Sequence, residues 1–153
     1  MSITRRLEEL NIRLPALSGP FGAYVPAKRV GGLIYVSGQL PMKDGALIGS
    51  GPVPSKCSFD DAKLAARQCV INALAAVNTL PGGIESLVSV VRVGAFINSD
   101  AGFTEQPRIA NAASELLIEI LGESGRHVRA AVGVNTLPLG APVEMEFIFE
   151  AKT

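Results

Sequence analysis

The feature that most constrains this chain is its last stretch, Gly125 to Ala151, which reads GRHVRAAVGVNTLPLGAPVEMEFIFEA. It contains two strand-like runs, Arg129–Val134 and Pro142–Ala151, separated by a connection rich in Pro and Gly. In the second run apolar Val, Met and Phe side chains occupy every second position, with glutamates between them and Ile148 as the exception. Because successive side chains of a strand point to opposite faces, this alternation predicts a β-sheet with one buried face.

One arginine and one carboxylate stand out in these two runs. Arg129 opens the first run, and Glu144 lies near the start of the second, on what we expect to be the neighbouring strand. An arginine fork beside a carboxylate suits a small substrate that carries a carboxylate, with a water nearby to be activated. An ordinary cross-strand ion pair is the commoner arrangement for such residues, so the pattern alone leaves both interpretations open.

The rest of the chain combines apolar strand patterns with two long helical patterns. The β-branched run Leu87–Ile97 predicts a central strand. A capped helix is expected over Ser58–Leu80, with Leu64 on its apolar face, and a second from Gln106 to Gly122, with a proline in its first turn. The remaining predicted segments are a short helix within residues 2–11, strands at Ala23–Pro26 and Gly32–Gly38, and a long loop at Asp44–Cys57.

The predicted element order is therefore β-β-α-β-α-β-β. We expect a single domain over residues 1–153, with an N-terminal helical extension over residues 1–13. Two helices interleaved with a mixed sheet can cover one of its faces and leave the other without a cover. The strands are too apolar for that second face to stay in water, so the pattern predicts a homo-oligomer.

Composition narrows the functional classes. Of the 153 residues 48% are hydrophobic and only 5% aromatic, which predicts a core of small aliphatic side chains. Lys+Arg and Asp+Glu are 14 each, so the chain lacks the basic character of a nucleic-acid binder. The two cysteines, Cys57 and Cys69, and the single histidine, His127, form no disulfide or zinc pattern. The charged opening MSITRRLEEL and the lack of a membrane-length apolar run make the cytoplasm the expected location.

Several strings resemble one known family. They are RAAVGVNTLP from Arg129, VEME from Val143, the strand end SGQ at Ser37, FGAYVP around Tyr24, and Asn111 followed four residues later by Glu115. Together they resemble the RidA/YjgF family of reactive-intermediate imine deaminases, formerly labelled L-PSP endoribonucleases, in a longer and divergent branch. The resemblance implies an α+β, chorismate-mutase-like fold: a mixed β-sheet with two long helices packed on one face, assembled as a homotrimer with clefts between subunits.

The resemblance also implies a reaction and a set of site residues. Family members hydrolyse 2-imino acids and their enamine tautomers to 2-oxo acids and ammonia. Carried over, the catalytic residues would be Arg129, which grips the substrate carboxylate, Glu144, which holds the attacking water, and Tyr24, which closes the pocket. The substrate-binding residues would be Ser37, Gly38, Asn111 and Ala131. No metal and no organic cofactor is expected, and the expected partner is a small carboxylate rather than nucleic acid or membrane.

Two departures from the family pattern bear on activity. Many members have Cys two residues after the arginine, where this chain has Ala131. His127 stands two residues before the arginine, where Pro or Ala is usual; it is an acid–base candidate, although a histidine in such a position is more commonly a surface or interface residue. A non-enzymatic trimer that binds a small carboxylate, such as an oxo acid, is therefore kept as the alternative function. An RNase fits the zero net charge and single histidine poorly.

Overall fold

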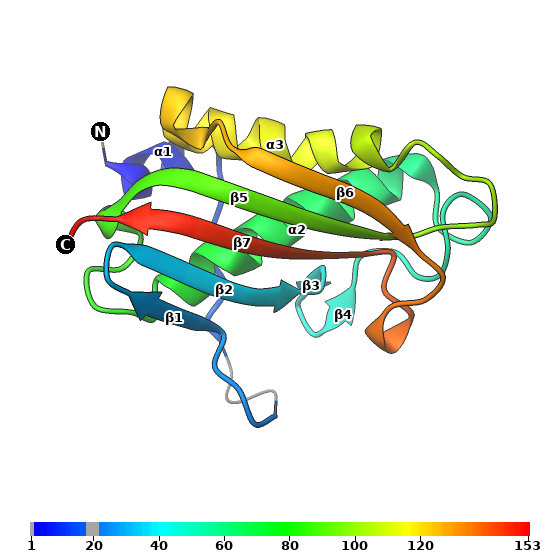
Figure 1. The fold of residues 1–153 in the computed structure, drawn as a ribbon, viewed down its shortest axis with the longest axis horizontal. Coiled ribbons are helices and arrows are strands. Elements are labelled where there is room, and N and C mark those ends of the chain that lie inside the picture. The colour runs from blue at the N-terminus through cyan, green and yellow to red at the C-terminus, as the bar shows by residue number, and fades with distance from the viewer. Residues whose placement is uncertain (1, 18–21) are drawn as a thin grey trace.

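A five-stranded mixed sheet forms the frame of the molecule (Figure 1). The computed structural model describes residues 2–17 and 22–153. The strand order is β1-β2-β7-β5-β6, and every neighbouring pair is antiparallel except β5 and β6, which run parallel. The strands are β1 (Ala27–Val30), β2 (Leu33–Gln39), β5 (Leu87–Asn98), β6 (Val128–Val134) and β7 (Val143–Ala151). The predicted α+β class with a mixed sheet is confirmed.

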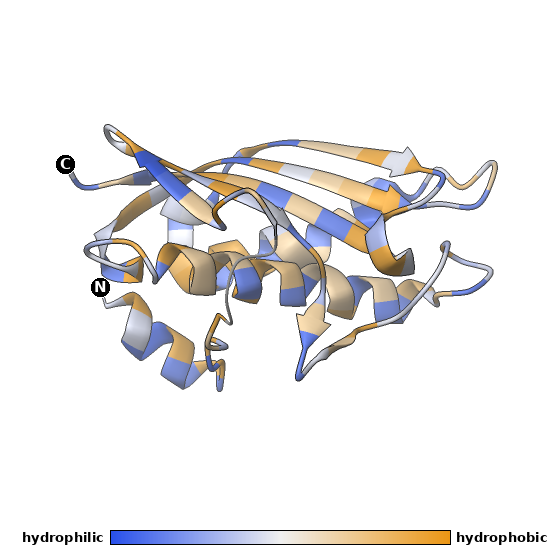
Figure 2. Cartoon of the chain, turned by 90° about the horizontal axis from the view of Figure 1, so that it is seen from below, coloured by the Kyte–Doolittle hydropathy of each residue, from blue (hydrophilic) through white to orange (hydrophobic). Residues whose placement is uncertain are grey.

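Two helices, α2 (Phe59–Val77) and α3 (Gln106–Leu121), lie side by side on one face of this sheet (Figures 1 and 2). The predicted cap of α2 is confirmed, because the Ser58 hydroxyl accepts from the Asp61 N–H at 3.1 Å. The end of α3 at Gly122 is also as predicted, with this glycine in the left-handed region at φ 63°. Small side chains on the buried side of α2 allow close packing: Ala62, Ala65, Ala66, Ala73 and Ala76.

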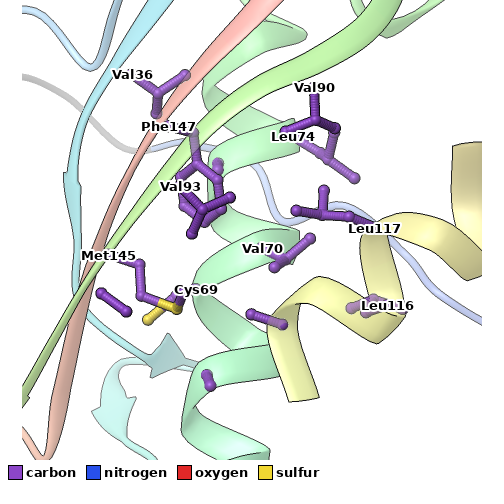
Figure 3. Close-up of a cluster of buried hydrophobic side chains, with 14 of the residues drawn as sticks. Val36, Cys69, Val70, Leu74, Val90, Val93, Leu116, Leu117, Met145 and Phe147 are labelled. Atoms are coloured by element: carbon purple, nitrogen blue, oxygen red, sulfur yellow. The ribbon is translucent and has the colours of Figure 1, made fainter. Parts of the chain in front are cut away.

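The core lies between the sheet and the two helices (Figure 3). The alternation in β7 holds throughout, since Val143, Met145, Phe147 and Phe149 are at most 1% exposed. Burying a side chain of this size stabilises the fold by about 1.5–3 kcal/mol. The glutamates between them consequently face the other side of the sheet, which no helix of the described part of the chain covers (Figure 2).

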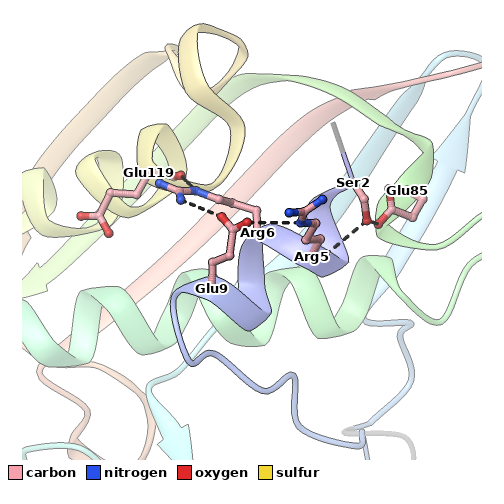
Figure 4. Close-up of polar contacts among 6 residues, drawn as sticks. All are labelled: Ser2, Arg5, Arg6, Glu9, Glu85 and Glu119. Carbon is pink, nitrogen blue, oxygen red and sulfur yellow. Dashed lines mark hydrogen bonds and ion pairs between the residues drawn. The ribbon is translucent and has the colours of Figure 1, made fainter.

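The N-terminal helix α1 (Ile3–Glu9) docks beside η1 (Ile84–Ser86) and α3 through polar contacts (Figure 4). The Glu85 carboxylate accepts from the Ser2 hydroxyl and from the backbone N–H groups of Ile3 and Thr4, at 2.7–3.3 Å. These N–H groups have no partner inside the helix, so a carboxylate there caps it. The Thr4 hydrogen bond, the largest cause, lowers the pKa of Glu85 to about 2. The predicted N-terminal helix is confirmed, with Glu85 as its anchor.

Two predictions for the first third of the chain are wrong. The first strand is not Ala23–Pro26 but Ala27–Val30, because Pro26 has no N–H to donate to a neighbouring strand. It turns into β2 through Gly31-Gly32, with Gly31 at φ 59°. The region read as loop contains a strand of a small hairpin, made of β3 (Met42–Lys43) and β4 (Ala46–Leu47) around an Asp-Gly turn.

Three further predictions fail in the helix α2 and in the order of the strands. Leu64, expected on the buried face of α2, is 54% exposed, and the helix ends at Val77 rather than near Leu80. More important for the site, β6 and β7 are not neighbours, because β5 lies between them (Figure 1). The segment β5-α3-β6 forms a parallel crossover unit, and β7 returns to pair on the other edge of β5.

Candidate functional site

The residues that the sequence singled out fall into two separate clusters. The register pairs Arg129 with Val93 and Val93 with Phe147, whereas Glu144 pairs with Phe96. Two strand spacings across and three residues along the strands place the two Cα atoms roughly 14 Å apart. Arg129 shares the helix-covered face with the buried Val93, and Glu144 lies on the uncovered face. Within one chain, therefore, the arginine and the carboxylate do not meet.

Arg129 is anchored against the first half of α3. One N–H of its Nη1 donates to Asn111 Oδ1 at 2.9 Å and the other to Ser114 Oγ at 3.1 Å. Its Nη2 donates to the backbone carbonyl of Pro107 at 3.4 Å. Among the residues that the structure describes, all of these partners are uncharged oxygens. The ordinary cross-strand ion pair considered for Arg129 is therefore not formed.

This anchoring leaves part of the Arg129 guanidinium available. A guanidinium has five N–H donors, and three are used by the contacts above. Across residues 2–17 and 22–153, the Nε–H and the second N–H of Nη2 have no hydrogen-bond partner. Two such donors match the two oxygens of a carboxylate. The arginine is thus held in place while keeping donors for an anion.

His127 extends the same cluster. Its Nε2 lies 2.9 Å from Ser114 Oγ, and its Nδ1 lies 2.7 Å from the carbonyl oxygen of Gly125. Burial lowers the pKa of the His127 imidazole, the charge of Arg129 adds to this effect, and the Gly125 hydrogen bond opposes it. We call Arg129, Asn111, Ser114, His127 and Ala131 the Arg129 cluster.

Glu144 lies at the other end of the sheet, where β2 passes β7 through a bulge at Val36–Gln39. A Cβ atom on Gly38 would lie 2.3 Å from Glu144 Oε1, so any larger residue here would displace this carboxylate from its position. Burial raises the pKa of Glu144, and the like charge of Glu146, two residues on and on the same face, raises it further. Glu146 itself pairs with Arg92 at 3.1 Å.

A cavity of about 530 Å³ opens beside Gly38. The Ser37 hydroxyl donates to the carbonyl of Val25 at 2.7 Å and so ties the segment after Tyr24 to β2. Tyr24 is 51% exposed and lines the cavity. The other walls are largely apolar: Pro15, Ala16, Leu17, Pro26, Leu40, Met42 and Leu139 among them. We call Glu144, Gly38, Ser37 and Tyr24 the Glu144 cluster.

The seven predicted site residues thus divide by position. Arg129, Asn111 and Ala131 lie together, with Ala131 half-buried next to the core, whereas the other four predicted residues form the Glu144 cluster. Sequence reasoning missed Ser114 as a partner of the arginine. Residues three apart on a helix share a face, so the predicted role of Asn111 pointed to Ser114 as well.

Within residues 2–17 and 22–153, no helix has the length and apolarity needed to cross a membrane. The same residues hold no group of three or more His, Cys, Asp or Glu side chains placed to bind a metal ion.

Known proteins resemble this chain over nearly its full length. The family model described as "YjgF/chorismate mutase-like, putative endoribonuclease" matches residues 4–150. Protein TCP17 of Trypanosoma cruzi is 36% identical, over 97% of this chain and 93% of that protein. The mitochondrial protein mmf1 of Schizosaccharomyces pombe is 32% identical, over 90% of this chain and 73% of that protein.

Solved structures agree with these matches. A protein of unknown function from Agrobacterium tumefaciens has a TM-score of 0.89 at 40% identity, covering 99% of this chain and 92% of that one. A "putative endoribonuclease" from Shewanella oneidensis has a TM-score of 0.92 at 27% identity, covering 98% and 99%. The YjgF protein of Escherichia coli shares the fold with a TM-score of 0.63 at 23% identity, covering 87% and 91%. The similarity to the first two therefore extends over α1.

Proposed function

Because the chain belongs to the YjgF/Rid family, we propose that it hydrolyses reactive 2-imino acids and their enamine tautomers to 2-oxo acids and ammonia. The reaction would take place in clefts between the subunits of a homotrimer. Each cleft would combine the Arg129 cluster of one subunit with the Glu144 cluster of another.

The observation that carries this proposal is the state of Arg129. Its guanidinium is fixed by uncharged oxygens of Asn111, Ser114 and Pro107. It therefore keeps its full charge and two donors for a ligand anion. A 2-imino acid presents a planar carboxylate that can accept both donors, and a lysine could not reproduce this contact.

The reaction also needs a base to activate a water molecule, and we assign this role to Glu144. Its raised pKa makes it a stronger base than an ordinary carboxylate. In the proposed step a water held by Glu144 attacks the imine carbon, and the electron pair of the C=N bond moves to nitrogen. Glu144 takes a proton from this water and returns it to the nitrogen. Glu144 then takes the proton of the new hydroxyl group and passes it to the amine nitrogen. The oxygen lone pair forms the C=O bond as the C–N bond breaks, which releases ammonia and leaves the 2-oxo acid.

The geometry of the single chain supports a site shared between subunits. The two clusters lie on opposite faces of the sheet, so a second copy must bring them together. The uncovered face and the β6 edge offer apolar area for such a contact, with Tyr35, Val128 and Val132 45%, 66% and 45% exposed. Light scattering coupled to size exclusion tests the assembly: we expect the mass of three chains, and a monomer would contradict the shared cleft.

A coupled assay tests the activity. Threonine dehydratase releases 2-iminobutanoate, and the appearance of 2-oxobutanoate is followed at a pH where uncatalysed hydrolysis is slow. We expect the protein to accelerate product release, Arg129→Ala to abolish the acceleration, and Arg129→Lys to restore only a small part of it. Arg67→Ala is the matched control, because Arg67 pairs with Glu119 on the helix layer. The proposal fails if the wild type gives no acceleration or Arg129→Ala keeps it.

One observation favours a second candidate function. The contacts that hold the Arg129 guanidinium do not involve Glu144. A protein with this arrangement can bind a small carboxylate, such as a 2-oxo acid, without turning it over. Calorimetric titration with 2-oxo acids separates the two functions. A binding protein keeps its affinity in Glu144→Gln and never shows turnover, whereas the deaminase loses turnover in that variant.

We also propose that the protein works in the cytoplasm. Both cysteines, Cys57 and Cys69, are buried free thiols, as is usual in reducing compartments. The mitochondrial relative mmf1 makes the mitochondrial matrix the competing location. Fractionation of the source cells decides between the two.

A further inference from the structure

Ser114 lies at the centre of a hydrogen-bonded chain that links His127 to Arg129. The chemistry of the atoms involved fixes which of them carries each hydrogen. A carbonyl oxygen only accepts, so His127 Nδ1 must carry a hydrogen and donate it to Gly125. In the neutral imidazole Nε2 is then an acceptor, and the nearest donor is the Ser114 hydroxyl at 2.9 Å. With its hydrogen directed to His127, Ser114 Oγ presents a lone pair to Arg129 Nη1 at 3.1 Å. His127 therefore fixes the orientation of the hydroxyl that holds the arginine.

Without His127, a competing arrangement is open to Ser114. A serine inside a helix tends to donate to the carbonyl four residues earlier, which here belongs to Ala110. That rotation would turn Oγ toward its own helix and away from Arg129. Asn111 and Pro107 would then hold the guanidinium alone, through one short and one long contact.

We propose that His127, acting through Ser114, is a positioning residue that sets the orientation of Arg129 toward the substrate carboxylate. The inference rests on the proposed function, in which Arg129 binds that carboxylate. It gives His127 a role other than acid–base catalysis, because both of its ring nitrogens are occupied by protein groups.

The charged groups around His127 are consistent with a neutral imidazole at physiological pH. On β6 the nearest is Arg129, and α3 presents the uncharged Ser114. The segment before the strand carries Arg126 and Glu123, which pair with each other at 3.0 Å. Burial and Arg129 both lower the pKa of His127, so its acceptor form predominates above its ordinary pKa of about 6.5.

Matched variants test this role. His127→Phe keeps the size of the ring and removes the acceptor, whereas His127→Gln places an acceptor within reach of Ser114. In the coupled assay we expect His127→Phe to raise KM about fivefold with kcat nearly unchanged, and His127→Gln to restore most of the loss. Ser114→Ala should match His127→Phe. The double variant should be no worse than either single one, because both remove the same contact.

A measurement on the free protein keeps the test independent of turnover. Nitrogen-15 NMR reports the imidazole tautomer and the order of the Arg129 Nε–H group. We expect His127 protonated at Nδ1 at pH 7.5, and a loss of Arg129 Nε–H order in His127→Phe that His127→Gln reverses. If the wild type shows no deaminase activity while this NMR result holds, the proposed function fails and the positioning role stands.

Several results would overturn the positioning role. They are a wild-type KM in His127→Phe, additive effects in the double variant, a loss confined to kcat, or an unchanged Arg129 Nε–H signal. Covalent labelling of Ser114 by a fluorophosphonate would also overturn it, because the Ser114–His127 pair would then be a nucleophile and its base.

Discussion

The Arg129 cluster and the Glu144 cluster differ in how completely one chain builds them. Three uncharged groups hold Arg129, and a fourth residue, His127, orients one of them. Glu144 has a like charge two residues away and burial that raises its pKa. One cluster is thus prepared to bind within the chain, whereas the other holds a carboxylate that lacks a cationic partner among the described residues. This difference is what the proposed shared cleft requires, because Glu144 would then meet a cationic group of the substrate or of a second subunit.

The largest expected effect concerns the chemical role of Glu144. Glu144→Gln keeps the shape of the side chain and removes the base, so kcat should fall about 10²- to 10⁴-fold while KM changes little. Steady-state kinetics of the coupled assay measure both constants. Glu150→Gln is the control, because Glu150 lies farther along the same strand and its carboxylate accepts a hydrogen bond from the neutral Ser89 hydroxyl. A raised KM with normal kcat would assign Glu144 to binding and remove the contrast between the clusters.

A smaller loss of rate is expected when the Glu144 carboxylate is displaced but not removed. Gly38→Ala would place a Cβ atom 2.3 Å from Glu144 Oε1, so the carboxylate must move. Displacement of a catalytic group by about 1 Å costs roughly 10- to 100-fold in rate. Gly32→Ala is the control in the turn just before the same strand, where the new Cβ would be 3.6 Å from Thr153, an ordinary contact. Equal kcat values for the two variants would contradict this role of Gly38.

The pH dependence of kcat/KM tests whether the like charge of Glu146 sets the Glu144 cluster apart from the Arg129 cluster. Glu144 must be ionised to act as a base, so activity should fall as the pH drops through its raised pKa. Glu146→Gln removes the like charge that helps to raise this pKa and frees Arg92. Both changes lower the pKa, so the acid limb of the kcat/KM profile should move to lower pH. An unmoved limb, or one moved to higher pH, would show that Glu146 does not act on Glu144.

The smallest effect lies outside both clusters. Glu85→Gln weakens the cap of α1 and should lower the free energy of unfolding by about 1 kcal/mol with kcat/KM unchanged. Because the pKa of Glu85 is lowered to about 2, its contribution is present above the ordinary value of 4.5 and is lost as the pH falls toward 2. Thermal unfolding against pH measures this, and the wild-type advantage over Glu85→Gln should vanish in that window. A stability difference that persists below pH 2 would contradict the assignment.

Local patterns in the sequence predicted the helices and most strands, because each depends on neighbouring residues. Ser58 caps α2, Gly122 ends α3, and the alternation in β7 defines the buried face. The strand order depends instead on how distant segments pair. The runs around Arg129 and Glu144 follow each other in the chain and look like a hairpin, yet β5 lies between them. The strand–helix–strand order of β5-α3-β6 is typical of a parallel pair, but it does not fix which edge β7 joins. In the structure β7 pairs with β5 and not with β6, so the hairpin does not form.

For the candidate site, the sequence predicted residue types better than it predicted their contacts. The resemblance led to Asn111 as a substrate-binding residue, and the structure places its Oδ1 in hydrogen-bond contact with the Arg129 guanidinium, a contact that was not predicted. Tyr24 was expected on a strand but lies in a bend beside a cavity, because pairing begins only after Pro26. The contact between Ser114 and His127 joins a helix to the start of a strand and could not be read from either segment alone.

Subunit complementation tests most directly the claim that two subunits share each site. We expect Arg129→Ala chains and Glu144→Gln chains each to be inactive alone. The two are co-expressed with different tags so that mixed oligomers can be purified. A cleft that takes its arginine from one chain and its glutamate from the other regains both residues, so random mixing at equal amounts should restore about a quarter of wild-type activity. Mixed oligomers as inactive as either parent would contradict the shared cleft.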